Sequence, residues 1–247
     1  MSSFISIDNV VYKYPDGFKA IDNISININK GEKVGLIGSN GAGKTTFLQL
    51  IIGALNLNSP SIILDDITLS KKNIKEIRKK VGYIFQDSDN QLFMNKVYED
   101  ISFGLRNMNL SSAEIKDRVS NISKYLDIED ILDKNIYKLS GGQKKLVAIA
   151  GILVMNPSLI LMDEPSVALD PKARRKLINI LKELDETILI ASHDLDMILD
   201  VCDRVILIDN GKLVVDGVSK EILTNEDLLE SSNLESPLSL YRDMGIL

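Results

Sequence analysis

Apolar and polar residues alternate along two segments near the N-terminus, Phe4 to Val11 and Ile21 to Ile28. Alternation with a period of two is typical of strands that have one buried face and one solvated face. A turn signal at Pro15, Asp16 and Gly17 separates the two segments. We therefore expect two strands that pair in an antiparallel unit.

Beyond this unit, short apolar runs alternate with segments of helical periodicity. The expected strands are Lys33–Ile37, Ser61–Leu64, Val81–Phe85, Leu159–Met162, Thr187–Ala191 and Arg204–Ile208. The expected helices are one that begins near Lys44, Ser111–Leu126, Ser140–Met155, Pro171–Leu184 and Asp194–Val201. The alternation predicts a mostly parallel sheet with helices on both faces. Two glycine-containing turns near Asn210 and Asp216 predict a closing hairpin.

The chain divides into one α/β domain and a short tail. Residues 1–218 contain all of the expected strands, and residues 87–157 form the expected inserted helical subdomain. Ser111 or Ser112 can cap the clearest helix of this subdomain, with Glu114 in its first turn. Residues 219–247 are mostly polar, so we expect a tail that is helical in part.

Composition limits the possible functions. The chain has 247 residues, of which 45% are hydrophobic and 26% charged, and it can bury a substantial core. The formal net charge of -6 gives no overall basic surface, so we expect no nucleic-acid partner. Cys202 is the one cysteine of the sequence, which excludes an intramolecular disulfide and a cysteine-based metal site.

No segment has the length of a membrane span. The most apolar helical stretch, Leu146 to Met155, ends at Asn156 and Pro157 and is far shorter than the roughly 20 residues that a bilayer requires. Met1 to Asn9 lacks a basic segment followed by a long apolar run, so no signal peptide is expected. We expect a soluble chain that acts at a membrane only through other subunits.

A glycine-rich turn lies between the strand that ends at Ile37 and the helix that begins near Lys44. It fits the GxxxxGK[ST] phosphate-binding pattern in the required strand–turn–helix setting. The glycines let several backbone N–H groups point at one anion, and the helix N-terminus adds partial positive charge. Lys44 can bridge the terminal phosphates, and the Thr45 hydroxyl can bind Mg²⁺. The alternative, a glycine-rich turn with an incidental lysine, is disfavoured by this setting. The expected ATP-binding residues here are Gly38, Ser39, Asn40, Gly41, Ala42, Gly43, Lys44, Thr45 and Thr46.

A second apolar strand ends in two carboxylates, Asp163 and Glu164. Ligands of parallel sheets bind at the carboxyl ends of the strands, where these side chains are expected. There Asp163 can hold Mg²⁺ through water, and Glu164 can polarise a water for attack on the γ-phosphate. Alone, such a pair is more often a solvated strand end. Together with the phosphate-binding turn, it predicts ATP hydrolysis with ATP and Mg²⁺ as ligands.

The segment Leu139–Gln143 reads LSGGQ and resembles the signature motif of ATP-binding-cassette (ABC) ATPases. The resemblance extends over roughly residues 4–217, with every expected motif in order. It implies a P-loop NTPase fold of the ABC type, an α/β fold with a mixed, mostly parallel sheet, an N-terminal antiparallel β subdomain and an inserted helical subdomain.

The residue types of the signature motif are themselves suited to binding a phosphate. Ser140 can cap the following helix, and Gly141 and Gly142 allow the backbone to approach an anion closely. A plain helix start is the alternative. The resemblance implies that these residues and Gln143 face the nucleotide held by a partner subunit. The active form would then be a head-to-tail dimer, either of two copies or with a related ATPase.

The resemblance also assigns further site residues. Gln86 matches the Q-loop glutamine, which contacts Mg²⁺ and the attacking water, and His193 matches the switch histidine at the γ-phosphate. Tyr14 matches the aromatic residue that stacks on adenine, and Asp170 ends the D-loop that links the two sites of the dimer. Taken singly, Gln86 could be a strand-end polar residue, His193 a structural histidine and Tyr14 a half-buried strand aromatic.

Two positions depart from the family pattern. The D-loop usually reads Gly-Leu-Asp, whereas here Ala168 replaces the glycine and adds a methyl group that restricts the loop. Leu146 stands where an arginine is common, which puts in doubt any polar contact of that arginine. Neither position belongs to the expected catalytic set of Glu164, His193 and Gln86.

The Q-loop continues as Asp87–Met94, and this stretch, like Tyr14–Gly17, is similar to energy-coupling-factor ATPases of the cobalt and nickel importer branch. The resemblance implies integral membrane subunits as partners and a peripheral location on the cytoplasmic face of the cell membrane. Residues Gln91–Met94 could line a groove for a helix of such a subunit. Core packing is an equal alternative. Nothing in the chain selects Co²⁺, Ni²⁺, a vitamin or another solute.

Two other classes of function stay open at this point. A soluble ABC ATPase acting on DNA or the ribosome usually carries a coiled coil, a metal-binding insertion or a second cassette, and this sequence has none. A regulatory nucleotide-binding module without turnover would not need the Glu164 carboxylate.

Overall fold

The computed structural model describes residues 3–56 and 61–243. The first two residues, residues 57–60 and the last four residues of the expected tail lie outside the described part.

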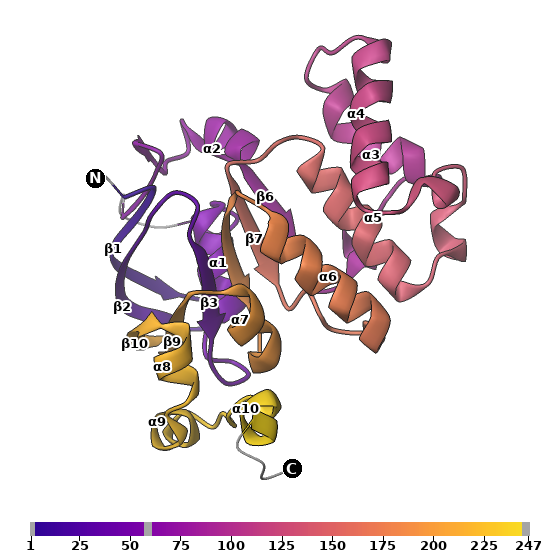
Figure 1. The fold of residues 1–247 in the computed structure, drawn as a ribbon. Coiled ribbons are helices and arrows are strands. Elements are labelled where there is room, and N and C mark those ends of the chain that lie inside the picture. Colours follow the sequence, from indigo (N-terminus) through magenta and orange to yellow (C-terminus); the bar gives the residue numbers. More distant parts are fainter. Residues whose placement is uncertain (1–2, 57–60, 244–247) are drawn as a thin grey trace.

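An antiparallel sheet of four strands forms one side of the molecule (Figure 1). Its order is β2-β1-β4-β5, with β1 (Ile5–Lys13), β2 (Lys19–Ile28), β4 (Ile62–Leu64) and β5 (Ile67–Thr68). The predicted antiparallel pair is confirmed as β1 and β2. The strand predicted at Ser61–Leu64 pairs antiparallel with β1, whereas the two-residue β5 was not predicted.

A second sheet has six strands in the order β10-β9-β3-β8-β7-β6. Its strands are β3 (Lys33–Ile37), β6 (Val81–Ile84), β7 (Leu159–Asp163), β8 (Thr187–Ala191), β9 (Arg204–Asp209) and β10 (Lys212–Val218). All neighbours are parallel except β9 and β10. The expected mixed, mostly parallel sheet is therefore confirmed. The hairpin turns at Asn210, but the turn predicted near Asp216 is wrong because Asp216 pairs with Ile206 inside β10.

Both faces of the parallel sheet are buried, as its continuous apolar strands predict. Along β7, Leu159 and Leu161 pack into a core shared with the antiparallel sheet and α1 (Lys44–Ile51). The intervening Ile160 and Met162 pack into a second core. Among the helices that contribute to this core are α5 (Gly141–Leu153), α6 (Pro171–Glu183) and α7 (Leu195–Val201).

The helical segment projects from one end of the parallel sheet (Figure 1). It contains α3 (Val97–Arg106) and α4 (Ser112–Tyr125), and α3 packs against α5. Ser111 caps α4 in a reciprocal capping box with Glu114, which settles the choice between Ser111 and Ser112. Further short helices are α2 (Ile74–Lys80), Ser88–Asn90, Glu129–Ile131 and Ile136–Lys138. The limits of a subdomain at residues 87–157 stay a prediction.

The tail is helical over much of its described length, as α8 (Ser219–Leu223), α9 (Glu226–Ser231) and α10 (Leu238–Asp243). The Asp196 carboxylate on α7 accepts hydrogen bonds from the backbone N–H groups of Leu238 and Ser239, at 3.3 and 2.9 Å. This contact joins the start of α10 to the first turn of α7. Within residues 3–56 and 61–243, no helix has the length and apolar character needed to cross a bilayer.

Candidate active site

The sheet topology brings four loop segments to one edge. The strands β3, β8, β7 and β6 are parallel neighbours, so their carboxyl ends lie side by side. The segments that follow them carry the phosphate-binding turn, His193, Glu164 and Gln86 respectively. Residues that are distant in the sequence therefore meet because of the strand order.

Close packing requires two glycines of the phosphate-binding turn. Gly38 has φ of 154°, and a Cβ atom there would lie 2.1 Å from the carbonyl oxygen of Ile208. Gly43 has φ of 107°, and its Cβ atom would lie 2.6 Å from the carbonyl oxygen of Ala20. Side chains at these positions would collide with backbone, so only glycine allows this turn.

Lys44 folds back over the turn from the first residue of α1. Its Nζ donates to the carbonyl oxygens of Gly38 and Ser39 at 2.8 and 3.2 Å, and lies 3.9 Å from Glu164 Oε1. Burial lowers the pKa of Lys44, although the negative charges of Glu164 and Asp163 oppose this effect. The ammonium group thus spans the space between the turn and the acidic strand end, where an anionic ligand would bind.

The Thr45 hydroxyl donates to Asp163 Oδ1 at 3.0 Å. The other oxygen of this carboxylate accepts a hydrogen bond from the Tyr83 hydroxyl at 3.2 Å. Burial raises the pKa of Asp163, and the hydrogen bonds from Thr45 and Tyr83 oppose that rise. A hydroxyl and a carboxylate oxygen held this close are the hard donors that Mg²⁺ prefers beside a nucleotide, so the residues fit this ion.

Glu164 turns away from β7 in an unusual backbone conformation, with φ of 47°. Its backbone N–H donates to the carbonyl oxygen of Ala191 at 2.8 Å. Its Oε2 accepts hydrogen bonds from Ser192 Oγ and the backbone N–H of His193, both at 3.2 Å. His193 Nδ1 lies 2.8 Å from the same oxygen. Ser192 was not singled out from the sequence, and its signal is its place between a core strand and His193.

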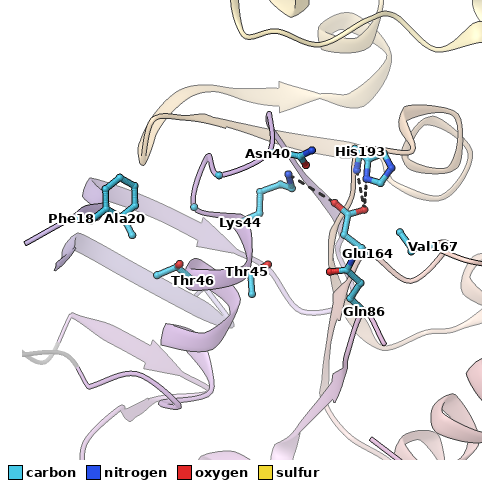
Figure 2. Close-up of a pocket in the computed structure, with 12 residues that line it drawn as sticks. Phe18, Ala20, Asn40, Lys44, Thr45, Thr46, Gln86, Glu164, Val167 and His193 are labelled. Carbon is cyan, nitrogen blue, oxygen red and sulfur yellow. Dashed lines mark hydrogen bonds and ion pairs between the residues drawn. The ribbon is translucent and has the colours of Figure 1, made fainter. Parts of the chain in front are cut away.

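A cavity of about 500 Å³ opens beside these groups (Figure 2). Glu164 and His193 lie on one side of it and Phe18 on the other, with Lys44 between them (Figure 2). The cavity brings together, from four segments, all three predicted catalytic residues and six of the predicted ATP-binding residues. It is lined by Phe18, Ala20, Asn40, Gly41, Gly43, Lys44, Thr45, Thr46, Gln86, Glu164, Val167 and His193.

The aromatic residue at the cavity wall is Phe18, not the predicted Tyr14. The Tyr14 hydroxyl forms a hydrogen bond of 3.0 Å with Thr46 Oγ1, and the Tyr14 ring packs edge-on against Tyr12. Phe18 is 57% exposed, and its ring is therefore available to a ligand. The sequence signal for Phe18 was an aromatic residue directly after the Pro15–Gly17 turn.

The signature residues do not line this cavity. Ser140 Oγ accepts from the Gln143 backbone N–H at 3.3 Å, and Gln143 Oε1 accepts from the Ser140 N–H at 3.1 Å. This capping box begins α5, and Ser140 and Gly141 are exposed. Asp170 also lies outside the cavity lining, and its carboxylate caps α6 by accepting from the Ala173 N–H at 2.8 Å. The phosphate contacts assigned to these residues stay predictions.

In the segment after Gln86, some side chains pack against the core and others are exposed. Gln91 accepts a hydrogen bond from the Phe85 backbone N–H at 3.2 Å and donates to the Ala148 carbonyl at 3.1 Å. Leu92 is 8% exposed and belongs to the core, whereas Phe93 is 63% exposed. Gln91 and Leu92 therefore follow the core-packing alternative, and Phe93 presents an apolar surface.

The two departures from the family pattern have distinct surroundings. Ala168 has φ of 62°, the left-handed conformation that glycine adopts without strain. Leu146 is 8% exposed and packs in the core under the helices. The leucine thus makes an apolar contact where a polar one is common.

Comparisons with known proteins agree with this geometry. The family model described as "ABC transporter" matches residues 21–167. An energy-coupling factor transporter ATP-binding protein, EcfA of Carboxydothermus hydrogenoformans, is 39% identical over 98% of this chain and 92% of its own length. The solved structure of cbiO1 from Clostridium perfringens, part of the ABC transporter complex cbiONQ, is 38% identical, with a TM-score of 0.85 over all of both chains.

A second solved structure shows a related protein in a nucleotide-bound state. It is the dimeric, post-hydrolysis form of the ATP-binding cassette MJ0796, bound to ADP and Pi. The two chains are 28% identical, with a TM-score of 0.79 over 87% of this chain and 98% of the other.

Proposed function

Because this chain belongs to the ABC transporter family of ATPases, in its energy-coupling-factor branch, we propose that it is the energy-coupling subunit of an importer. In this proposal, two ATP molecules with Mg²⁺ bind between two head-to-tail ATPase subunits. Closing and reopening of the dimer drive integral membrane subunits. The transported solute contacts those other subunits.

The observation that supports this proposal most strongly is that Lys44, Thr45, Glu164 and His193 line one cavity. Asp163 lies next to this cavity, where it accepts a hydrogen bond from the Thr45 hydroxyl. Lys44 and the backbone of its turn bind the β- and γ-phosphates. Thr45 and Asp163, with Gln86 at the wall, hold Mg²⁺, which neutralises charge on the phosphates when bound. Glu164 accepts a proton from the attacking water, and His193 contacts the γ-phosphate.

The exposed N-terminus of α5, which carries the signature residues, supports the proposed dimer. Ser140 and Gly141 lie at the N-terminus of α5, where backbone N–H groups and partial positive charge favour an anion. They are exposed and do not line the cavity of their own chain. We propose that they contact the γ-phosphate bound by the partner subunit, so that each site is completed by two subunits. The dimeric state named for the MJ0796 cassette supports this arrangement.

An apolar surface supports a membrane partner. Phe93 and Phe103 are 63% and 38% exposed, and their rings pack edge-on with centroids 4.7 Å apart. This aromatic pair follows the Q-loop and fits a helix of a membrane subunit. The cbiO1 relative is named as part of a complex, which supports assembly of the same kind at the cytoplasmic face of the membrane.

Cobalt or nickel ions are the proposed cargo. The support is the similarity of Tyr14–Gly17 and Asp87–Met94 to the cobalt and nickel importer branch. A vitamin or another solute is the competing cargo, because no residue within the described ranges 3–56 and 61–243 is placed to select the cargo.

Uptake by the assembled transporter tests the proposal. The full chain is co-expressed with its neighbouring membrane subunits, and the complex is purified with a tag on the ATPase. Vesicles that contain the complex should accumulate radioactive Co²⁺ only with internal MgATP, and a Glu164→Gln complex should not. Accumulation of a vitamin in place of metal would overturn the cargo. Absence of any membrane protein in the purified complex would overturn the transporter role.

A further inference from the structure

A buried lysine joins α5, the helix that begins at the signature residues and is called the signature helix below, to the Q-loop. Lys145 lies one turn after the start of α5, and the residue is 3% exposed. Its Nζ donates hydrogen bonds to the carbonyl oxygens of Phe85 and Gln86, at 3.0 and 2.8 Å. One ammonium group therefore fixes two consecutive peptide units at the point where β6 ends.

Gln86 depends on this contact for its position. Among the described residues, its side-chain amide has no hydrogen-bond partner within the chain, and the residue is exposed at the cavity wall. The contact that restrains its main chain comes from Lys145. The point from which the Gln86 side chain extends is thus held from α5.

The cost of burying an ammonium group argues against simple core filling. Desolvation of a charge costs several kcal/mol, so a methionine of similar length would satisfy packing alone. Lys145 instead directs its ammonium group to two defined acceptors, and these hydrogen bonds fix where the carbonyl oxygens of Phe85 and Gln86 lie.

Two further contacts tie the same loop to α5. Lys144 Nζ lies 2.6 Å from Asp89 Oδ1, and Gln91 Nε2 donates to the Ala148 carbonyl at 3.1 Å. With Lys145, these contacts span the loop from Phe85 to Gln91. The loop and the signature helix are thereby joined as one unit.

We propose that Lys145 is a positioning residue, which acts through Gln86 by holding the Q-loop backbone against the signature helix. A displacement of α5, whose N-terminus would face the partner's nucleotide, then moves Gln86 in the chain's own cavity. This inference rests on the proposed role of Gln86 at the bound nucleotide. It adds a residue outside the cavity that determines how Gln86 meets the substrate.

A double-mutant cycle on the full chain tests this role. The variants are Gln86→Ala, Lys145→Met and the double variant, and kcat and KM for MgATP are measured for each. Lys176→Met is the matched control, because Lys176 Nζ also donates to a main-chain carbonyl, that of Asp127, away from the cavity. Thermal unfolding verifies that each variant is folded, and Lys145→Gln replaces Lys145→Met if the latter does not fold.

We expect Lys145→Met to lower kcat about as far as Gln86→Ala does, by roughly tenfold, with KM changed by less than about threefold. The double variant should be no more than about twofold below Gln86→Ala alone, because both changes remove one function. Lys176→Met should retain the wild-type kcat.

Two results would overturn the proposed role of Lys145 without affecting the proposed role of Gln86. One is a folded Lys145 variant with wild-type kcat. The other is a double variant in which the two losses multiply to about a hundredfold, as independent residues would give. By contrast, a wild-type kcat in Gln86→Ala would reject the proposed role of Gln86 itself. Affinity for MnATP, measured by electron paramagnetic resonance, should change by the same factor in Gln86→Ala and Lys145→Met, within the roughly threefold limit expected for KM.

Discussion

His193 Nδ1 lies 2.8 Å from the Oε2 atom of Glu164, the carboxylate that follows β7. The same oxygen accepts hydrogen bonds from Ser192 Oγ and the His193 backbone N–H. The Glu164 side chain is 9% exposed, whereas the His193 side chain is 59% exposed. The segment after β8 thus fixes the carboxylate, while most of the histidine side chain stays exposed at the cavity wall.

Replacing Glu164 by glutamine tests the carboxylate as the base. The glutamine side chain is of similar size and can still accept from Ser192 and the His193 N–H, but it cannot take a proton from water. We expect kcat to fall by about 10²- to 10⁴-fold while ATP affinity stays within about threefold. Steady-state ATPase assays and calorimetric titration measure the two quantities.

Ser192→Ala is the matched control for this change. It removes one hydrogen bond of 3.2 Å to the carboxylate but leaves the proton acceptor in place. A loss of less than about tenfold is expected. If Glu164→Gln hydrolysed ATP at the rate of Ser192→Ala, the carboxylate would not be the base.

Phe18→Ala should weaken ATP binding more than Tyr14→Ala. Phe18 lines the cavity and is 57% exposed, whereas the Tyr14 hydroxyl is bound to Thr46. Stacking of a base on an aromatic ring contributes about 1–3 kcal/mol, so the dissociation constant should rise by roughly 5- to 150-fold. Fluorescence titration with an ATP analogue measures it. If Tyr14→Ala weakened ATP binding more than Phe18→Ala, the residue that contacts adenine would be Tyr14.

Ala168→Gly should stabilise the fold. Ala168 has φ of 62°, and an L-residue in this conformation carries about 1–2 kcal/mol of strain, part of which the entropy of glycine in the unfolded chain offsets. We expect a gain of about 0.5–1 kcal/mol in the free energy of unfolding, measured with urea. The same change at Ala173, in the first turn of α6, should lower stability. A loss at both positions would exclude strain at Ala168.

Cys202 should make the protein less stable at alkaline pH. Burial raises the pKa of its thiol to about 12, above its value of about 9 in the unfolded chain. Between these values the unfolded state has lost the proton and the folded state has not, so stability falls as pH rises. Cys202→Ala lacks this effect. Its stability deficit relative to wild type should shrink by about 1–2 kcal/mol between about pH 8 and pH 10. A constant deficit would contradict the raised pKa.

The sequence predicts the strands of the parallel sheet well because their apolar runs have clear ends. Lys33–Ile37 and Thr187–Ala191 match the observed strands at both ends. The short β5 escapes prediction because two residues carry no periodicity, although its pairing partner β4 ends only two residues before it. The prediction of a turn near Asp216 is wrong. It depends on the next residue, Gly217, because glycine often signals a turn, but here Gly217 continues strand β10.

The site residues likewise divide into those that the sequence predicts and those that it does not. Two sequence motifs identify four of the site residues. Lys44 and Thr45 have fixed positions in the phosphate-binding turn, and Asp163 and Glu164 have fixed positions at the end of one apolar strand. Phe18 was not singled out, because an aromatic residue after a turn is a weak signal, and its place at the cavity beside Thr45 and Thr46 depends on the tertiary structure. Ser192 and Lys145 likewise act through contacts between segments that only the tertiary structure brings together.

The mass of the Glu164→Gln chain in solution with MgATP tests the composite site most directly. Multi-angle light scattering should show a dimer with one bound ATP per chain, and the same chain with a further Ser140→Arg change should stay monomeric while binding ATP. If the Glu164→Gln chain bound ATP as a monomer, or if Ser140→Arg left the dimer intact, nucleotide would not be held between two subunits.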